Sequence, residues 1–249
     1  MGATVCAAVQ AADGLELVAA VDPGGAGWPA GSADSPVRIS PDLGALVETG
    51  AEVAVDFTVP GVAVANATWC AGQGIHTVIG TTGIDEQAAG QLGDAYPSSG
   101  PLGCVVAPNF AIGAVLMMRF AEMAAPWFET AEIIELHHDA KVDAPSGTAM
   151  ATAARMAAAS PEWGADPTQV EALAGARGGR GPAGIRVHAV RLRGLVAHQE
   201  VILGTAGQTL TIRHDSIDRE SFMPGVILAV RKVTTRPGLT VGLEHLLDI

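Results

Sequence analysis

The residues best suited to chemistry lie together near the middle of the chain, in the segment ELHHDAKVDAPSGTA at 135–149. The run AEIIELHH (131–138) is typical of a strand. Such a strand would bring His137 and His138 to its end on opposite faces, because side chains alternate along a strand. Lys141 follows in the next turn. Since imidazole and ammonium groups bind carboxylates and move protons near neutral pH, the segment predicts a basic, proton-handling pocket.

A helix start follows directly and adds an element that can bind an anion. Pro145 suits the beginning of a helix, and Ser146, Gly147 and Thr148 would form its first turn. Backbone N–H groups in a first turn have no partner within the helix, so they can bind a small carboxylate substrate. The alternative is a capped helix beside two surface histidines that have no chemical role.

A metal site is a less favoured interpretation of the same segment. His137, His138 and Asp139 are adjacent, and adjacent strand residues point apart, so they cannot easily chelate one ion. The sequence contains neither an HExxH motif nor a CxxC pair. We therefore expect no metal. The cysteines are far apart and are expected to be buried thiols in a reducing compartment: Cys6, Cys70 and Cys104.

The first part of the chain alternates short apolar runs with helix-like segments. The runs typical of strands are LELVAAVD (15–22), AEVAVDFT (51–58), HTVIGTTG (76–83) and GCVVAPNF (103–110). The helix-like segments between them are 41–50, 61–74 and 84–96. Continuous apolar strands separated by helices predict an α/β fold, namely a Rossmann-like doubly wound parallel sheet.

The carboxyl ends of these strands are the second place where chemistry is expected, because open parallel sheets bind their ligands there. Asp22 ends the first run, where dinucleotide-binding folds place an acid for ribose hydroxyls. DFT (56–58), GTTG (80–83) and APNF (107–110) end the others. Each could be an ordinary tight turn, but together they favour a nucleotide cleft. No arginine directly follows Asp22, which modestly favours NADH.

The pattern changes after residue 108. We expect a long apolar helix at 111–128, a strand at 131–138, a helix at 147–158 and a loop at 160–184. The runs 185–194, 195–205 and 208–216 follow without an intervening helix, and residues 204–207 suit a hairpin, so a second α+β domain with a mixed or antiparallel sheet is predicted. The predicted domains are 1–108, completed by 218–249 with a helix at 218–233, and 109–217.

Charge and composition exclude several classes of partner. The net charge of -12 argues against nucleic acid and against anionic membrane surfaces. No apolar run has the length of a membrane span, and the N-terminus shows no secretory signal pattern, so a cytoplasmic protein is expected. The RGG-like stretch at 177–180 occurs once in an acidic chain and is interpreted as a flexible loop.

These motifs together resemble the dihydrodipicolinate reductase family, above all its actinobacterial branch. The resemblance rests on the string His-His-x-x-Lys-x-Asp-Ala-Pro-Ser-Gly-Thr at 137–148. DFTVPGVAVANA, GTTG and APNFAIGAV precede it, and HAVRLRGLVAHQEVILGTAGQTLTIRHDSIDRESFMPGV follows it. The resemblance extends from about residue 2 to the C-terminus. A homoserine or amino-acid dehydrogenase, the alternative oxidoreductase, would be expected to lack this string.

The resemblance implies reduction of 4-hydroxy-tetrahydrodipicolinate to tetrahydrodipicolinate by NADH or NADPH, in diaminopimelate and lysine biosynthesis. By position, it implies His137 as proton donor or acceptor and Lys141 as proton donor, with His138, Gly147 and Thr148 holding the substrate carboxylates. The cofactor contacts that it implies are Asp22, Gly80, Thr81, Thr82, Ala107, Pro108, Asn109 and Phe110. It also implies hinge closure between a dinucleotide-binding and a substrate-binding domain, and a homotetramer formed through the second domain.

The beginning of the sequence departs from the family pattern. The family starts with a strand and a Gly-x-x-Gly-x-x-Gly loop for the pyrophosphate, whereas MGATVCAAVQAADG resembles the helix after that loop. Loss of this central strand would leave a gap between two neighbours, so we expect the chain as given to be unstable or to bind cofactor poorly. An extension of about a dozen residues that carries the strand and loop would restore both. The alternative function is a catalytically impaired, oligomeric substrate-binding relic.

Overall fold

The computed structural model describes residues 1–160 and 162–247 and divides the chain into two compact units. The first unit is Met1–Ile112 with Arg219–Ile249, and the second is Gly113–Asp218. The boundaries drawn from the sequence, after residues 108 and 217, lie slightly earlier in the chain. The C-terminal segment therefore returns to the unit in which the chain begins.

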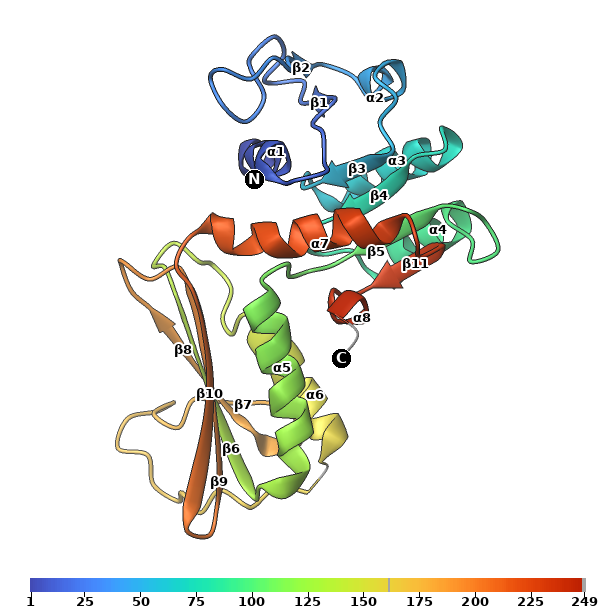
Figure 1. Cartoon of the computed structure of the whole chain (residues 1–249). Helices are drawn as coiled ribbons and strands as arrows, with labels where there is room; N and C mark the ends of the chain where they lie inside the picture. The colour runs from blue at the N-terminus through green and yellow to red at the C-terminus, as the bar shows by residue number, and fades with distance from the viewer. Residues whose placement is uncertain (161, 248–249) are drawn as a thin grey trace. The chain divides into compact units, whose positions relative to one another are not determined.

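The first unit is built on a parallel sheet with the strand order β11-β5-β4-β3. Its strands are β3 (Val53–Asp56), β4 (His76–Ile79), β5 (Gly103–Val106) and β11 (Gly238–Val241). β4 and β5 are buried along almost their whole length, as expected for strands covered on both faces. Helices α3 (Pro60–Gly72) and α4 (Glu86–Ala95) pack on one face and α7 (Met223–Val233) on the other (Figure 1). The predicted doubly wound fold class is confirmed.

A smaller sheet in the same unit pairs β1 (Ala20–Val21) with β2 (Ile39–Ser40) in parallel. The strand predicted at 15–22 is largely wrong, because residues 15–19 pair with no strand in the described part of the chain. β1 and β3 belong to different sheets. The remaining helices of this region are α1 (Gly2–Ala11), which packs on α7, and α2 (Gly44–Glu48).

The second unit is built on a mixed sheet, as predicted. Its strand order is β10-β9-β6-β8-β7, in which β7 is the short strand Gly179–Arg180. Its long strands are β6 (Thr130–His137), β8 (Arg186–Arg191), β9 (Ala197–Thr205) and β10 (Gln208–Ser216). β6 pairs with β8 in parallel and with β9 in antiparallel orientation. The predicted hairpin is confirmed: Thr205 pairs with Gln208, and Gly207 has a φ of 79°, which glycine adopts without strain.

Two helices, α5 (Ile112–Ala124) and α6 (Gly147–Ala159), lie against one face of this mixed sheet (Figure 1). Alternate residues of the strands point into the core beneath them. The buried core side chains include Ala121, Ile133, Ala153, Met156, Val187, Val201 and Leu203. The other residues of each strand, such as Ile134 and Ile202, lie on the outer face and are only partly buried.

Several element boundaries differ from the prediction for local reasons. The helix predicted at 111–128 ends at Ala124 and continues as a 3-10 turn, Ala125–Trp127, where Pro126 has no N–H for a helical hydrogen bond. The loop predicted at 160–184 contains β7 (Gly179–Arg180), which pairs with β8, and a 3-10 turn, Pro182–Gly184.

The C-terminal segment holds elements that the sequence pattern does not reveal. A 3-10 turn, Arg219–Phe222, precedes α7, while β11 and α8 (Glu244–Leu247) follow it. β11 completes one edge of the first sheet by pairing with β5. Among the described residues, no helix combines the length and the apolar character needed to cross a membrane.

Candidate active site

The cluster of charged residues lies on the second unit, and at its centre is a buried glutamate. Glu135 lies two residues after Ile133, on the same helix-covered face of β6, and its side chain is 0% exposed. Its Oε2 accepts hydrogen bonds from His137 Nδ1 at 2.6 Å and from Arg191 Nη1 at 2.8 Å. Its Oε1 accepts from Arg191 Nη2 at 2.7 Å and from the backbone N–H of Ser146 at 3.0 Å. One carboxylate thus connects two strands to the start of α6.

These partners determine the charge states. Burial alone would raise the pKa of Glu135, but hydrogen bonds from Arg191, His137 and Ser146 lower it below its ordinary value. An ionised carboxylate can only accept, so His137 Nδ1 must carry the proton. Burial, together with the charges of Lys141 and Arg191, lowers the pKa of His137, although Glu135 opposes this shift. At neutral pH the ring is therefore uncharged and Nε2 offers a lone pair, as a general base requires.

Lys141 lies in the loop between β6 and α6. Its ammonium donates to both carboxylate oxygens of Asp143, at 2.7 and 2.9 Å. This contact lowers the pKa of Asp143. Arg191 Nη2 also donates to the backbone carbonyl of Asp143 at 2.7 Å, so the loop is fastened to β8. The structure therefore holds Lys141 in a loop that is tied to the partners of Glu135.

The predicted substrate-binding residues flank this loop. β6 ends at His137, so His138 is not a strand residue, contrary to prediction; it is exposed and takes no part in the hydrogen bonds of Glu135. The predicted helix start is confirmed: Ser146 caps α6 by accepting the N–H of Ala149 at 3.2 Å. Gly147 is exposed and Thr148 half-buried in the first turn, where an anion would bind.

The predicted cofactor residues lie on the first unit, at the carboxyl ends of strands. Asp22 follows β1 and is exposed, and its Oδ1 accepts the N–H of Gly24 at 2.8 Å. The others follow β4 and β5, which are neighbours in one sheet: Gly80, Thr81, Thr82, Ala107, Pro108, Asn109 and Phe110. The structure therefore brings the residues at 80–82 and 107–110 together. It places Asp22 at the end of the separate small sheet.

Close packing joins the ends of β3, β4 and β5. A Cβ atom on Gly80 would lie 2.1 Å from Phe57 Cε1, so this position tolerates only glycine while Phe57 is in place. The centroid of the Phe57 ring lies 5.7 Å from that of Phe110, and the ring planes are inclined by 52°. The hydroxyl of Thr81 donates to the carbonyl of Thr58 at 3.3 Å. These strand ends thus form one continuous surface.

Asp56 belongs to the DFT strand end of this surface, and its sequence position alone indicates no individual role. It ends β3 and is 8% exposed. Its Oδ1 accepts the N–H of Thr58 at 2.8 Å and the Thr58 hydroxyl at 2.6 Å, and its Oδ2 accepts from Asn66 Nδ2 at 2.8 Å. These bonds fix the turn that carries Phe57. The Asp-x-Thr spacing is the available signal, because aspartate commonly bonds the backbone two residues later.

Glu135 and Arg191 likewise have no role assigned from the sequence. The signal for Glu135 is its spacing, since a residue two positions before His137 lies on the same face of a strand. Arg191 gives no local signal, because it is distant in the chain. Only the parallel pairing of β6 with β8, which sets His137 opposite Arg191, brings it to the cluster.

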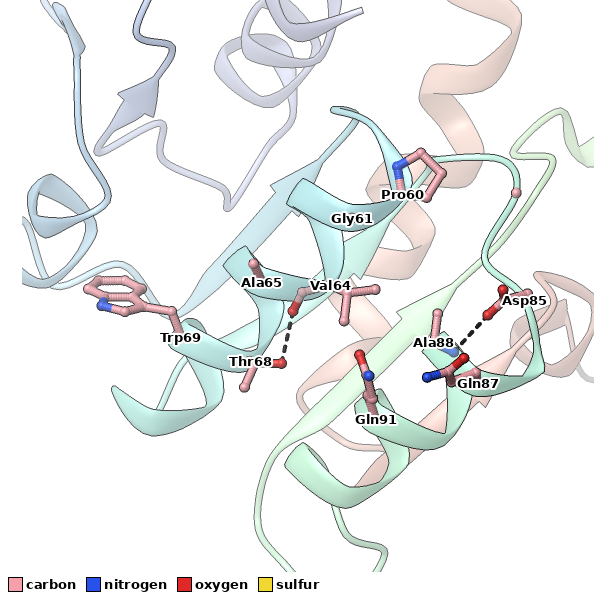
Figure 2. Close-up of a pocket in the computed structure, with 11 residues that line it drawn as sticks. Pro60, Gly61, Val64, Ala65, Thr68, Trp69, Asp85, Gln87, Ala88 and Gln91 are labelled. Carbon is pink, nitrogen blue, oxygen red and sulfur yellow. Dashed lines mark hydrogen bonds between the residues drawn. The ribbon is translucent and has the colours of Figure 1, made fainter.

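A groove of about 710 Å³ lies between α3 and α4 (Figure 2). It contains none of the predicted catalytic, substrate-binding or cofactor-contacting residues, although Gly83 of the GTTG turn lies in its lining. Its lining is Pro60, Gly61, Val64, Ala65, Thr68, Trp69, Gly83, Asp85, Gln87, Ala88 and Gln91. Asp85 caps α4 through the N–H of Ala88, and Thr68 donates to the carbonyl of Val64, so these polar groups serve their own helices. In the part of the chain that the structure describes, no group of three or more His, Cys, Asp or Glu is placed to hold a metal ion.

Comparison with known proteins identifies the family. The models "Dihydrodipicolinate reductase, N-terminus" and "Dihydrodipicolinate reductase, C-terminus" match residues 1–110 and 113–247. The 4-hydroxy-tetrahydrodipicolinate reductases of Nocardia farcinica and Cutibacterium acnes are 53% and 51% identical, over 100% of this chain and 95% of each relative. The solved dipicolinate-bound dihydrodipicolinate reductase of Paenisporosarcina sp. TG-14 is 41% identical with a TM-score of 0.85, over 97% of this chain and 93% of that chain. The chain therefore belongs to the dihydrodipicolinate reductase family.

Proposed function

We propose that the chain reduces 4-hydroxy-tetrahydrodipicolinate to tetrahydrodipicolinate with a nicotinamide dinucleotide, as a step of diaminopimelate and lysine biosynthesis. Its family membership and its 53% identity to the Nocardia farcinica reductase support this reaction. The structural observation that carries the proposal is the buried Glu135, which holds both the imidazole of His137 and the start of α6. A base and an anion-binding helix start are thereby fixed to the same carboxylate.

The substrate is a small dicarboxylate, and the Paenisporosarcina relative binds dipicolinate, a planar compound of that class. In our proposal the first-turn N–H groups of Gly147 and Thr148 hold one carboxylate, and the side chain of His138 contributes to carboxylate binding. Gly147 and His138 are exposed, so a ligand can reach both. A helix N-terminus favours a bound anion through the direction of its backbone N–H groups and its dipole.

The reaction removes a hydroxyl group as water and adds a hydride and a proton, so the site needs groups that move protons. We assign proton donation or acceptance to Nε2 of His137, whose other ring nitrogen is bonded to Glu135. We assign a second proton donor to Lys141, whose ammonium is bonded to Asp143 in this structure. A substrate carboxylate would compete with Asp143 for that ammonium, which would move Lys141 toward the substrate.

The nicotinamide cofactor supplies the hydride when it is bound. The residues at the strand ends of the first unit fit such a cofactor. The exposed carboxylate of Asp22 can accept ribose hydroxyls, and the packed turns at 80–82 and 107–110 present backbone groups beside the Phe57–Phe110 pair. No arginine directly follows Asp22 to pair with a ribose phosphate, so we propose NADH in preference to NADPH.

We further propose a cytoplasmic homotetramer that assembles through the outer face of the mixed sheet. This face carries Ile134, Leu136 and Ile202, which are half-buried, and Val190, which is 36% exposed. A second copy would remove these apolar side chains from water. Light scattering on the full chain measures the mass directly. Substitution of Ile134 by Glu should shift the mass toward smaller species, and a monomeric unmodified chain would contradict the assembly.

The central experiment measures oxidation of NADH and of NADPH by the chain with 4-hydroxy-tetrahydrodipicolinate, with and without dipicolinate. We expect turnover that dipicolinate inhibits competitively, with a lower KM for NADH than for NADPH. Binding of dipicolinate without any turnover would contradict the proposed reaction and would match the substrate-binding relic instead.

A further inference from the structure

We propose that Glu135 is a positioning residue for His137 and that Arg191 in turn holds Glu135 in place. The inference deepens the proposed function and rests on it, because it states how the base of that reaction is oriented. Substrate cannot reach Glu135, whose side chain is 0% exposed and whose carboxylate oxygens each accept two hydrogen bonds. Any effect of Glu135 on the reaction must therefore pass through its neighbours.

The first such effect is on the tautomer of His137. The bidentate contact with Arg191, at 2.7 and 2.8 Å, keeps Glu135 ionised and fixes the plane of its carboxylate. The 2.6 Å bond to Nδ1 then requires the proton of the neutral ring to be on Nδ1. Nε2 is left as the atom that accepts a proton, and the imidazolium formed when it does so is stabilised by the adjacent anion. The same division of roles occurs wherever a carboxylate orients a catalytic histidine.

The second effect is on the spacing between the base and the anion-binding helix start. Glu135 Oε1 accepts the N–H of Ser146, the residue that caps α6 and directly precedes Gly147. Arg191 also bonds the carbonyl of Asp143, which lies within the loop between the two ends. Both ends of the segment from His137 to Ser146 are therefore hydrogen-bonded to the buried carboxylate of Glu135, which closes the segment into a loop. This closure sets where Nε2 lies relative to the first-turn N–H groups.

The charges that face His137 predict the direction of a pH effect. Glu135 precedes it on β6, Lys141 approaches from the loop, and Arg191 lies opposite on β8. Removal of the glutamate charge would leave only the two cations facing the ring, so the pKa of His137 should fall further below its ordinary value. The acid limb of the profile of kcat/KM against pH should then move to lower pH.

The first test compares Glu135→Gln and Glu135→Asp in the full chain, with Glu132→Gln as the matched control. Glu132 lies on the opposite face of β6 and bonds a histidine and an arginine of its own, His188 and Arg177. We expect Glu135→Gln to lower kcat about 10–100-fold, up to the loss expected without His137 itself, with a smaller change in KM and the acid limb moved to lower pH. Glu135→Asp keeps the charge and should recover part of kcat. Glu132→Gln, on the outer face proposed for assembly, should lose much less kcat than Glu135→Gln and keep the pH profile of the unmodified chain.

An unchanged kcat and pH profile in Glu135→Gln would overturn the proposal. Equal losses in Glu135→Gln and Glu132→Gln would also overturn it, because they would indicate a general structural effect. If the unmodified chain shows no reductase activity, the proposed function fails by itself, and the second measurement still decides the orientation of the ring.

The second measurement is made on the unmodified chain and needs a variant, His137→Gln, only to assign the signals. Nitrogen-15 NMR of the histidine rings distinguishes the protonated from the unprotonated nitrogen, and the His137 signals are those that disappear in His137→Gln. Above the pKa of the ring we expect the proton on Nδ1. A His137 ring with its proton on Nε2 would overturn the positioning role whatever the activity of the variants.

Discussion

Strand β6 carries two triads of the same composition on its two faces. The inner triad is Glu135, His137 and Arg191, and the outer triad is Glu132, His188 and Arg177. In each, a carboxylate bonds a histidine nitrogen and a guanidinium, and in each the strand β8 supplies a partner. They differ in exposure, because the side chain of Glu135 is 0% exposed and that of Glu132 is 33% exposed.

The environment of such a triad, and not its residue types, therefore determines what it can do. Burial would raise the pKa of both glutamates, and in both the arginine and histidine partners lower it below its ordinary value. In the single chain, where the side chain of Glu132 is 33% exposed, water can replace a lost partner, as at most surface ion pairs. Water cannot reach Glu135, so the loss of one partner leaves a buried charge without compensation. The inner triad is therefore rigid enough to orient a proton-transfer group.

The largest expected effect that separates the triads is on stability. Arg191→Ala should lower the free energy of unfolding by about 3–5 kcal/mol, because it leaves the buried carboxylate of Glu135 without its main partner. Arg177→Ala, at a guanidinium that is 32% exposed, should cost much less. Urea unfolding of both variants is the measurement. Equal losses would show that burial does not separate the two triads.

The next effect is on turnover. His137→Gln should lower turnover by roughly a hundredfold or more, the usual scale for loss of a general acid or base. Binding of the substrate should change little. His188→Gln removes the corresponding imidazole of the outer triad and should leave turnover near that of the unmodified chain. The measurement is steady-state oxidation of NADH by both variants across a pH series. Near-full turnover in His137→Gln would show that this residue does not transfer the proton.

Lys141 sharpens the comparison, because it supplies a second cation beside the inner triad. Lys141→Ala should reduce both turnover and affinity, with dipicolinate inhibition weakened roughly tenfold, since a hydrogen bond between charged groups is lost. The control is Arg193→Ala, a cation of the same region that is bonded to Asp139 and whose side chain is 91% exposed. Dipicolinate inhibition that is unaltered in Lys141→Ala would exclude the lysine from the pocket.

The smallest expected effect is on the pH dependence of stability. Because the pKa of Glu135 is lowered on folding, its stabilising contribution is fully present above the ordinary value of 4.5 and is lost as the pH falls through the lower folded value. Glu135→Gln should therefore flatten the fall in stability below pH 4.5, and Glu132→Gln should flatten it less, because solvent screens that group. Urea unfolding at several acid pH values tests this. A larger flattening in Glu132→Gln would reverse the comparison.

The fold could be predicted where burial leaves a pattern in the sequence. β4 and β5 are buried along almost their whole length, and β3 is partly buried. All three appear in the sequence as continuous apolar runs, so their positions and the doubly wound class followed from the sequence alone. Residues 15–19 have the same apolar pattern but no neighbouring strand to pair with in the described chain. β11 is an edge strand of four residues, and the two in its middle are only half-buried. Its sequence therefore shows only a weak apolar pattern.

The candidate site could be predicted only where its residues are contiguous. His137, Lys141 and the start of α6 lie within one segment, so their types and spacing are enough to indicate a basic pocket. Arg191 enters the site through the register of β6 with β8, and Glu135 differs from an ordinary strand residue only because it is buried. Register and burial are properties of the folded sheet, so the sequence gives no signal for Arg191 and, for Glu135, only its spacing from His137.

The contact between Gly80 and Phe57 has a consequence for how this family can vary. The Phe57 ring occupies the space that a side chain at position 80 would need, with a separation of only 2.1 Å from the missing Cβ. A larger residue at 80 can therefore be accepted only together with a smaller or displaced side chain at 57. In an alignment of many members, the two positions should covary, with glycine at 80 wherever an aromatic ring stands at 57. The residues at positions 57 and 80 would then indicate how these strand ends pack in each branch of the family.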